Sequence, residues 1–115
     1  MAVASTFKDH IVLIGLGHLG FRVAKYLNGL DQEIVIIEKN PSKDLIGNVR
    51  SLGIPVIEDD GTNEKALVDA GVPLAKTIIL CTQNDALNLK MALKARSINP
   101  NIEVVFLFSL REEHK

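Results

Sequence analysis

Apolar residues along this chain gather in short runs that alternate with amphipathic segments. Runs rich in valine, isoleucine and leucine, with the length of strands buried on both faces, occupy residues 10–15, 33–38, 54–58, 76–82 and 102–108. Segments with apolar residues at helical spacing lie between them, at residues 18–28, 41–53, 63–71 and 85–98. The pattern predicts five strands and four helices in regular alternation.

Polar residues and prolines mark several ends of these elements. Ser42 stands where it can cap the second helix, and Asn84 or Asp85 can cap the fourth. Pro55 shortens the third strand and favours the edge of a sheet, because proline cannot donate to a ladder of hydrogen bonds. These signals support the boundaries that the hydrophobic pattern predicts.

Strands and helices that alternate without a hairpin signal favour parallel strands joined by right-handed helical crossovers. We therefore predict an α/β fold, a Rossmann-like doubly wound parallel sheet in one domain. A chain of 115 residues is long enough to bury such a core. We place the domain at residues 10–110, after a lead-in at 1–9 and before a tail at 111–115. A fuller fold of this class has six strands, so another segment or chain can complete the sheet.

Composition narrows the possible partners. The net charge is −1, aromatic residues make up 4% and tryptophan is absent, so neither a basic field nor a base-stacking surface is expected for nucleic acid. No apolar run reaches the roughly 18 residues that a membrane-spanning helix needs, which argues against direct membrane insertion. Cys81 is the single cysteine, which favours a reduced, cytoplasmic setting. Any contact with the inner membrane face is expected through a partner or a fused pore domain.

A glycine motif joins the first strand to the first helix. Residues 15–20 have the spacing G-x-G-x-x-G, formed by Gly15, Leu16, Gly17, His18, Leu19 and Gly20. In this context the first glycine permits a tight turn, the second lets a pyrophosphate approach, and the third lets helix and strand pack closely. Free N–H groups at the helix start then bind the anion. His18 can donate to a phosphate or point into solvent, and the sequence leaves both interpretations open.

An acidic residue stands where a dinucleotide site needs one. Glu38 ends the second strand, 18 residues after Gly20, and can accept hydrogen bonds from the hydroxyl groups of a ribose. Lys39 follows it, but the neighbouring carboxylate disfavours a 2′-phosphate. NAD(H) or an adenine nucleotide is therefore expected rather than NADP(H). A turn that needs glycine but binds nothing is the alternative, and Lys39 can be a plain loop charge.

Two further segments follow strands at the same predicted sheet edge, where ligands of open α/β sheets bind. After the third strand come Asp60, Gly61 and Thr62, which can contact an adenine or form an ordinary turn. After the fourth come Thr82, Gln83 and Asn84, which can contact the second half of a ligand or serve only to cap a helix. No catalytic constellation and no cluster at metal-ligand spacing is seen, so neither an enzyme nor a metal site is predicted.

The chain resembles the TrkA-N, or RCK (regulator of potassium conductance), nucleotide-binding domain over about residues 9–110. The glycine motif is not the most specific part of the likeness. More specific are the D-G-T turn followed by LVDAGV, then T-x-N-D-x-x-N, then ARSINPNIEVV. Ordinary dehydrogenases do not share that order of motifs.

The resemblance implies regulation rather than turnover. Such domains form dimers and rings attached to potassium channels and transporters, and their ligands are NAD(H), ATP, ADP or AMP. Carried over by position, the glycine motif matches the phosphate loop, Glu38 the ribose acid and residues 60–62 the adenine-side turn. Thr82, Asn84 and Asn88 match the loop and helix after the fourth strand.

One segment departs from the family pattern. Residues 106–109 are Phe-Leu-Phe-Ser, where many members have Arg-Leu-Phe-Asp. The acids of calcium-gated members are also missing from this strand, so no calcium site is expected.

The helix at residues 85–98 favours an assembly. Leu87, Met91 and Ala95 share one face, and further apolar residues widen the arc, which predicts burial on two sides. One side can meet the sheet, and the other can meet a second copy across a two-fold interface or be covered within the domain. The leading hypothesis is a nucleotide-sensing regulatory domain of a potassium channel or transporter. The cofactor-binding half of an NAD-dependent oxidoreductase and a plain dimerisation domain are the alternatives.

Overall fold

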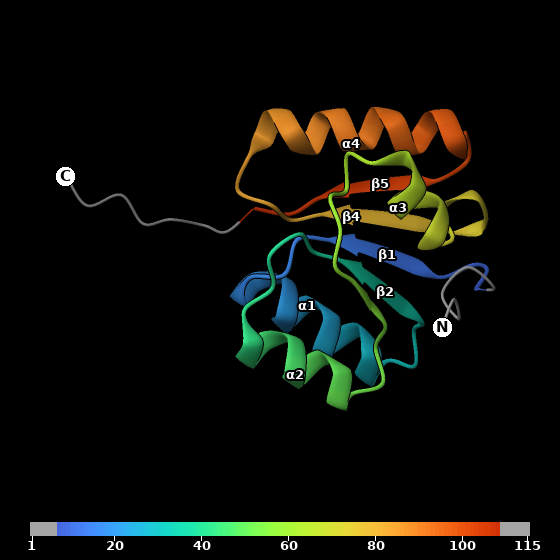
Figure 1. Ribbon diagram of the computed structural model, residues 1–115. Helices are drawn as coiled ribbons and strands as arrows, with labels where there is room; N and C mark the ends of the chain where they lie inside the picture. Colours follow the sequence, from blue (N-terminus) through green and yellow to red (C-terminus); the bar gives the residue numbers. More distant parts are fainter. Residues whose placement is uncertain (1–6, 109–115) are drawn as a thin grey trace.

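The computed structural model describes residues 7–108 and contains the alternating elements that the sequence predicts (Figure 1). The strands are β1 (Ile11–Ile14), β2 (Ile34–Ile37), β3 (Val56–Ile57), β4 (Thr77–Leu80) and β5 (Glu103–Phe106). The helices are α1 (His18–Gly29), α2 (Lys43–Ser51), α3 (Glu64–Asp69) and α4 (Asp85–Ile98), with a short 3-10 helix, η2, at Val72–Leu74. The predicted tail at 111–115, Ser109 and most of the predicted lead-in lie outside the described residues.

All strand pairs are parallel, in the order β3-β2-β1-β4-β5. The chain first builds outward from β1 through β2 to β3, then returns to the other side of β1 with β4 and β5. This order confirms the doubly wound sheet and creates a switch point between β1 and β4. Val56 and Ile57 form an edge strand beside β2, as Pro55 predicts.

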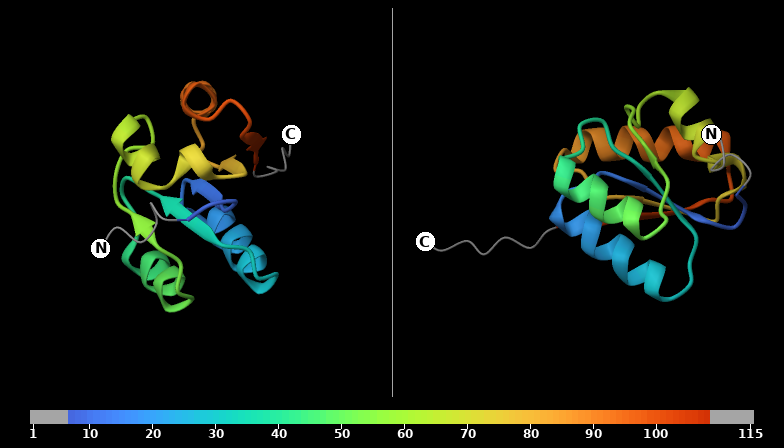
Figure 2. Two further views of the ribbon diagram at one scale, coloured as in Figure 1. Left: turned by 90° about the vertical axis from the view of Figure 1, so that its right-hand side faces the viewer. Right: turned by 60° about the horizontal axis from the view of Figure 1, so that its bottom comes forward.

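Helices cover both faces of the sheet (Figures 1 and 2). Ile11 and Leu13 of β1 pack into one apolar cluster with residues of α1 and α2, including Ala24 and Val49. The alternate residues of β1 pack into a second cluster with α3 and α4. Because successive side chains of a strand point to opposite faces, a strand between two helical layers has to be apolar throughout.

Several elements are shorter than the sequence predicts. β1 ends at Ile14 because Gly15 takes a positive φ of 106°, which turns the chain away from the sheet. α3 ends at Asp69, and Gly71, with a φ of 78°, leads into η2. β5 ends at Phe106, so residues 107 and 108 lie beyond the strand. None of the helices between residues 7 and 108 is long and apolar enough to cross a membrane.

Candidate functional site

A cleft of about 760 Å³ lies at the carboxyl ends of β1 and β4, at the switch point of the sheet. Ligands of open α/β sheets bind at this place in the fold. The glycine motif, the end of β2 and the loop after β4 all contribute to it. The predicted site residues that line the cleft are Gly15, Leu16, Gly17, His18, Leu19, Gly20, Glu38, Thr82 and Gln83.

The three glycines of the motif differ in how strictly the fold itself requires a residue without a side chain. A Cβ on Gly20 would stand 2.5 Å from the carbonyl oxygen of Gly15, so only glycine lets α1 approach the turn this closely. Gly15 combines its positive φ with a Cβ position only 3.0 Å from the backbone nitrogen of Thr82. Gly17 is exposed, and a Cβ there would meet nothing within 4 Å. The protein's own packing therefore does not require Gly17 to be glycine, whereas a ligand close to the turn would.

His18 is the first residue of α1, and its exposed side chain lines the cleft. Gly17 is the N-cap residue and provides no side-chain hydrogen bond to the helix. The helix N-terminus therefore opens toward the cleft, where its dipole favours an anion.

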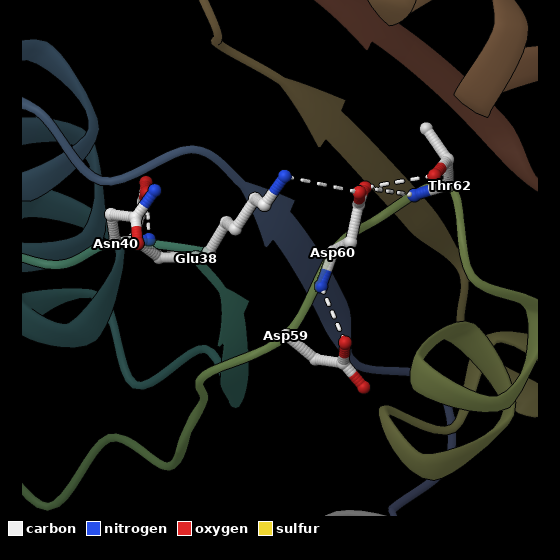
Figure 3. Close-up of polar contacts among 6 residues, drawn as sticks. Glu38, Asn40, Asp59, Asp60 and Thr62 are labelled. Atoms are coloured by element: carbon white, nitrogen blue, oxygen red, sulfur yellow. Dashed lines mark hydrogen bonds and ion pairs between the residues drawn. The ribbon is translucent and has the colours of Figure 1, made fainter.

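Glu38 follows β2 directly, and backbone donors fix its carboxylate at the edge of the cleft. Oε1 accepts a hydrogen bond from the N–H of Leu16 at 2.5 Å. Oε2 accepts one from the N–H of Asn40 at 2.9 Å (Figure 3). A carboxylate has further lone pairs after two such bonds. Glu38 can therefore still accept from hydroxyl groups of a ligand.

Asp60 takes part in hydrogen bonds within the protein. Its Oδ1 accepts from the N–H of Thr62 at 2.9 Å and from the Thr62 hydroxyl at 2.8 Å (Figure 3). Its Oδ2 lies 3.7 Å from Nζ of Lys39. The bonds from Thr62, followed by the charge of Lys39, lower the pKa of Asp60. Asp60, Thr62 and Lys39 do not line the cleft. The assignment of residues 60–62 to the adenine side therefore stays a prediction.

Gly61 is buried and packs against the core. A Cβ there would lie 2.7 Å from Sδ of Met91 and 2.9 Å from Cγ2 of Ile14. Close packing of the 60–62 turn on β1 and α4 therefore explains this glycine without a ligand.

The residues after β4 form a small hydrogen-bonded network. The Thr82 hydroxyl lies 2.5 Å from Oδ1 of Asn88, and Nδ2 of Asn88 donates to the backbone oxygen of Thr82 at 3.1 Å. Asn84 caps α4, since its Oδ1 accepts from the N–H of Leu87 at 2.9 Å. Asn88 is 1% exposed and does not line the cleft. Asn88 instead holds the loop after β4 in place through its two hydrogen bonds with Thr82.

Four residues line the cleft that the sequence did not assign to the site: Cys81, Asp85, Leu107 and Phe108. Burial, followed by the charge of Glu38, raises the pKa of the Cys81 thiol to about 11, so the thiol stays protonated at neutral pH. Asp85 begins α4 and was expected only as a possible cap. Leu107 and Phe108 reach the cleft because β5 ends early, which the hydrophobic run could not indicate. Among residues 7–108, no group of three or more metal-binding side chains is found.

Curated relatives match most of this chain. A protein from Methanothermus fervidus with no assigned function is 38% identical over 110 residues, covering 94% of this chain and 17% of that protein. The Trk system potassium uptake protein TrkA homolog of Pyrococcus horikoshii is 31% identical over 96 residues, covering 84% of this chain and 42% of that protein. The chain thus spans less than half the length of either relative.

Solved structures share the fold. The TrkA-N domain of the inner membrane protein YbaL from Escherichia coli superposes with a TM-score of 0.80 at 27% identity, covering 88% of this chain and 73% of that one. The GsuK channel bound to NAD has a TM-score of 0.73 at 20% identity, covering 88% of this chain and 18% of that one, a likeness of fold. The TrkA-N domain model matches residues 11–115. The chain therefore belongs to the TrkA-N domain family.

Proposed function

We propose that this chain is a nucleotide-sensing regulatory domain of a potassium channel or transporter. Its ligand is NAD(H) or an adenine nucleotide such as ATP, ADP or AMP. Family membership supports the regulatory role, together with relatives named as potassium uptake and channel proteins. The domain acts at the cytoplasmic face, as a dimer or ring joined to a membrane subunit.

The observation that carries the proposal is the hydrogen bond between Glu38 and the N–H of Leu16. It brings the carboxylate at the end of β2 to the glycine turn at the start of α1. A ligand with a pyrophosphate beside a ribose needs these two features close together. The helix N-terminus binds the pyrophosphate, and Glu38 accepts from the ribose hydroxyls.

The cleft binds its ligand without turning it over. The Cys81 thiol is protonated at neutral pH and is a weak nucleophile in that form. Ligand binding regulates through a difference in affinity between two arrangements of the assembled domains. The energy available for regulation is that difference, and no bond has to be made or broken.

A thermal-shift panel with NAD+, NADH, ATP, ADP and AMP tests the proposal. A ligand at 100 times its Kd stabilises the folded domain by about 2.7 kcal/mol, which is easily measured. Gly17→Val is the matched control, because nothing in the fold lies within 4 Å of a Cβ added at this exposed position. The proposal predicts stabilisation of the wild-type chain and none of the variant. No shift with any of these nucleotides would refute it.

The outer face of α4 supports self-association. Leu89 and Leu93 are 54% and 64% exposed, one turn apart, while Met91 and Ala95 of the same helix are buried in the core. The prediction that α4 is apolar on two sides is consistent with this arrangement. We propose that the exposed leucines meet a second copy. Sedimentation should show a dimer that Leu93→Lys dissociates and that the exposed change Lys90→Gln leaves intact; a monomer at high micromolar concentration contradicts this.

A further inference from the structure

The charges around the cleft are unusual for a site expected to bind phosphates. Glu38 lies on the β2 side and Asp85 on the β4 side, whereas no lysine or arginine is among the lining residues that the structure describes. Lys39 does not line the cleft, and its Nζ lies 3.7 Å from Oδ2 of Asp60. Among the described residues, the glycine turn and His18 at the start of α1 and the N-terminus of α4 favour an anion, and the carboxylate of Asp85 opposes the last of these. The cleft therefore accommodates a bridging pyrophosphate better than additional phosphoryl groups.

The Thr82 hydroxyl has a defined hydrogen-bonding direction. Nδ2 of Asn88 donates to the Thr82 carbonyl, so the amide oxygen of Asn88 faces the hydroxyl. Because that oxygen can only accept, the hydroxyl donates its single proton to it across the 2.5 Å contact rather than to the carbonyl oxygen of Asn84, which is farther away at 3.3 Å. The N–H of Asn84 donates to one lone pair of the hydroxyl at 3.2 Å. One acceptor lone pair remains for a ligand.

We propose that the β4 side of the cleft selects a ligand that ends in a hydroxyl-bearing nucleoside or ribose, against one that ends in a phosphoryl group. Asp85 supplies the charge discrimination, Thr82 supplies the acceptor, and Asn88 is the positioning residue. The inference rests on the proposed function and names the ligand class of the same site. NAD(H) or another ADP-ribose compound is preferred over ATP.

The chemistry of the two alternative terminal groups, a phosphoryl group and a ribose, explains the preference. Ionised phosphoryl oxygens carry negative charge and only accept hydrogen bonds, so they are repelled by Asp85 and find no donor in the Thr82 hydroxyl. A ribose hydroxyl donates to the same acceptor and adds no charge. Leu107 and Phe108 line this end of the cleft as well and offer apolar surface to a base or a nicotinamide ring.

Titration calorimetry with ADP-ribose and ATP tests this selection, in magnesium-free buffer with chelator. Both ligands contain ADP and differ only in the group beyond it. The wild-type chain should bind ADP-ribose more tightly. Asp85→Asn should lower the ratio of the ATP Kd to the ADP-ribose Kd about fivefold, the usual scale for a solvent-accessible charge pair. Added salt should shrink that change, because screening weakens exposed charges.

Asp44→Asn is the matched control, because Asp44 is an exposed first-turn acid of α2 that does not line the cleft. The ratio of the ATP Kd to the ADP-ribose Kd should be the same in Asp44→Asn as in the wild-type chain. Thr82→Val should lose preference for ADP-ribose, and Thr82→Ser should keep it because serine retains the hydroxyl. Equal affinities for ATP and ADP-ribose, or a ratio unchanged in Asp85→Asn, would overturn the inference and leave the proposed function standing. Binding of neither ligand would overturn the inference, and the absence of a thermal shift with every nucleotide of the panel would overturn the proposed function as well.

Discussion

The carboxylate of Glu38 accepts a hydrogen bond from the backbone N–H of Leu16, 22 residues earlier in the chain. The bond joins the end of β2 to the turn that follows β1, two neighbouring parallel strands in register. It fixes the acid at the cleft before any ligand arrives. Preorganised groups lose less conformational freedom on binding, which favours affinity.

Gly17→Val separates binding from folding. Gly17 has a φ of −101°, which side chains readily adopt, and a Cβ there would have nothing within 4 Å. The free energy of unfolding should change by no more than about 1 kcal/mol, the scale of an altered N-cap. Nucleotide affinity should fall at least about tenfold, because the side chain occupies the space over the helix N-terminus. Chemical denaturation and calorimetry measure the two quantities.

Gly20→Val is the contrasting change. Its Cβ would lie 2.5 Å from the Gly15 carbonyl oxygen, which is backbone and cannot easily move. Stability should fall by about 1–3 kcal/mol or more, as in other overpacked interiors. Equal stability losses for the valine variants at positions 17 and 20 would contradict the distinction between a ligand glycine and a packing glycine.

The thiol of Cys81 should react slowly. Burial raises its pKa to about 11 from an ordinary value of 9.0. At pH 8 the thiolate, which is the reactive form, is then about a hundredfold scarcer than in an ordinary cysteine. Iodoacetamide labelling should accordingly be at least that much slower in the folded chain than in the chain unfolded by urea. Equal labelling rates would show that the thiol is not buried as described.

Asp60→Asn should change how stability depends on pH. The hydrogen bonds from Thr62 lower the pKa of Asp60, so the ionised form stabilises the fold. This contribution is present above the ordinary value of 3.8 and is lost as the pH falls through the lowered pKa. Because the side chain is 40% exposed, it amounts to less than about 1 kcal/mol. Denaturation curves of both chains should differ most near pH 7 and converge in acid.

Asn99→Ala should affect stability alone. Nδ2 of Asn99 donates to the carbonyl oxygens of Val72 and Ala75, both at 2.9 Å, near the end of the molecule opposite the cleft. The substitution leaves buried acceptors without this donor and should lower the free energy of unfolding by about 1–3 kcal/mol. Nucleotide affinity, measured where the variant is folded, should equal that of the wild-type chain. A weakened affinity would show coupling between the two ends of the sheet.

The fold could be predicted because local signals agreed with it. α4 spans residues 85–98 as the sequence predicts, since Asn84 caps its start and the Asn-Pro-Asn segment ends it. β3 is only two residues long, although the apolar run covers 54–58. Ile54 is buried without joining the strand, because its N–H bonds to the carbonyl of Val49 at the end of α2. Hydrophobicity predicts burial, but it does not predict which backbone groups pair.

The candidate site was predictable only where a local sequence pattern encodes it. The glycine turn and Glu38 follow from spacing alone, and both line the cleft. Asn88 and Gly61 match motif positions, yet the structure buries them and gives each a packing or hydrogen-bonding reason. Phe108 lines the cleft through the path of the chain after β5, which no local pattern encodes.

We propose above that the cleft binds a nucleotide whose ribose hydroxyls donate to Glu38. Titration calorimetry of NADH with the wild-type chain, Glu38→Ala and Glu33→Ala tests it most directly. Glu33 is an exposed acid before the other end of β2 and serves as the matched control. Glu38→Ala alone should weaken NADH binding, by about 1.5–3 kcal/mol, the range for a charged hydrogen bond. Equal NADH affinity in all three chains would contradict it.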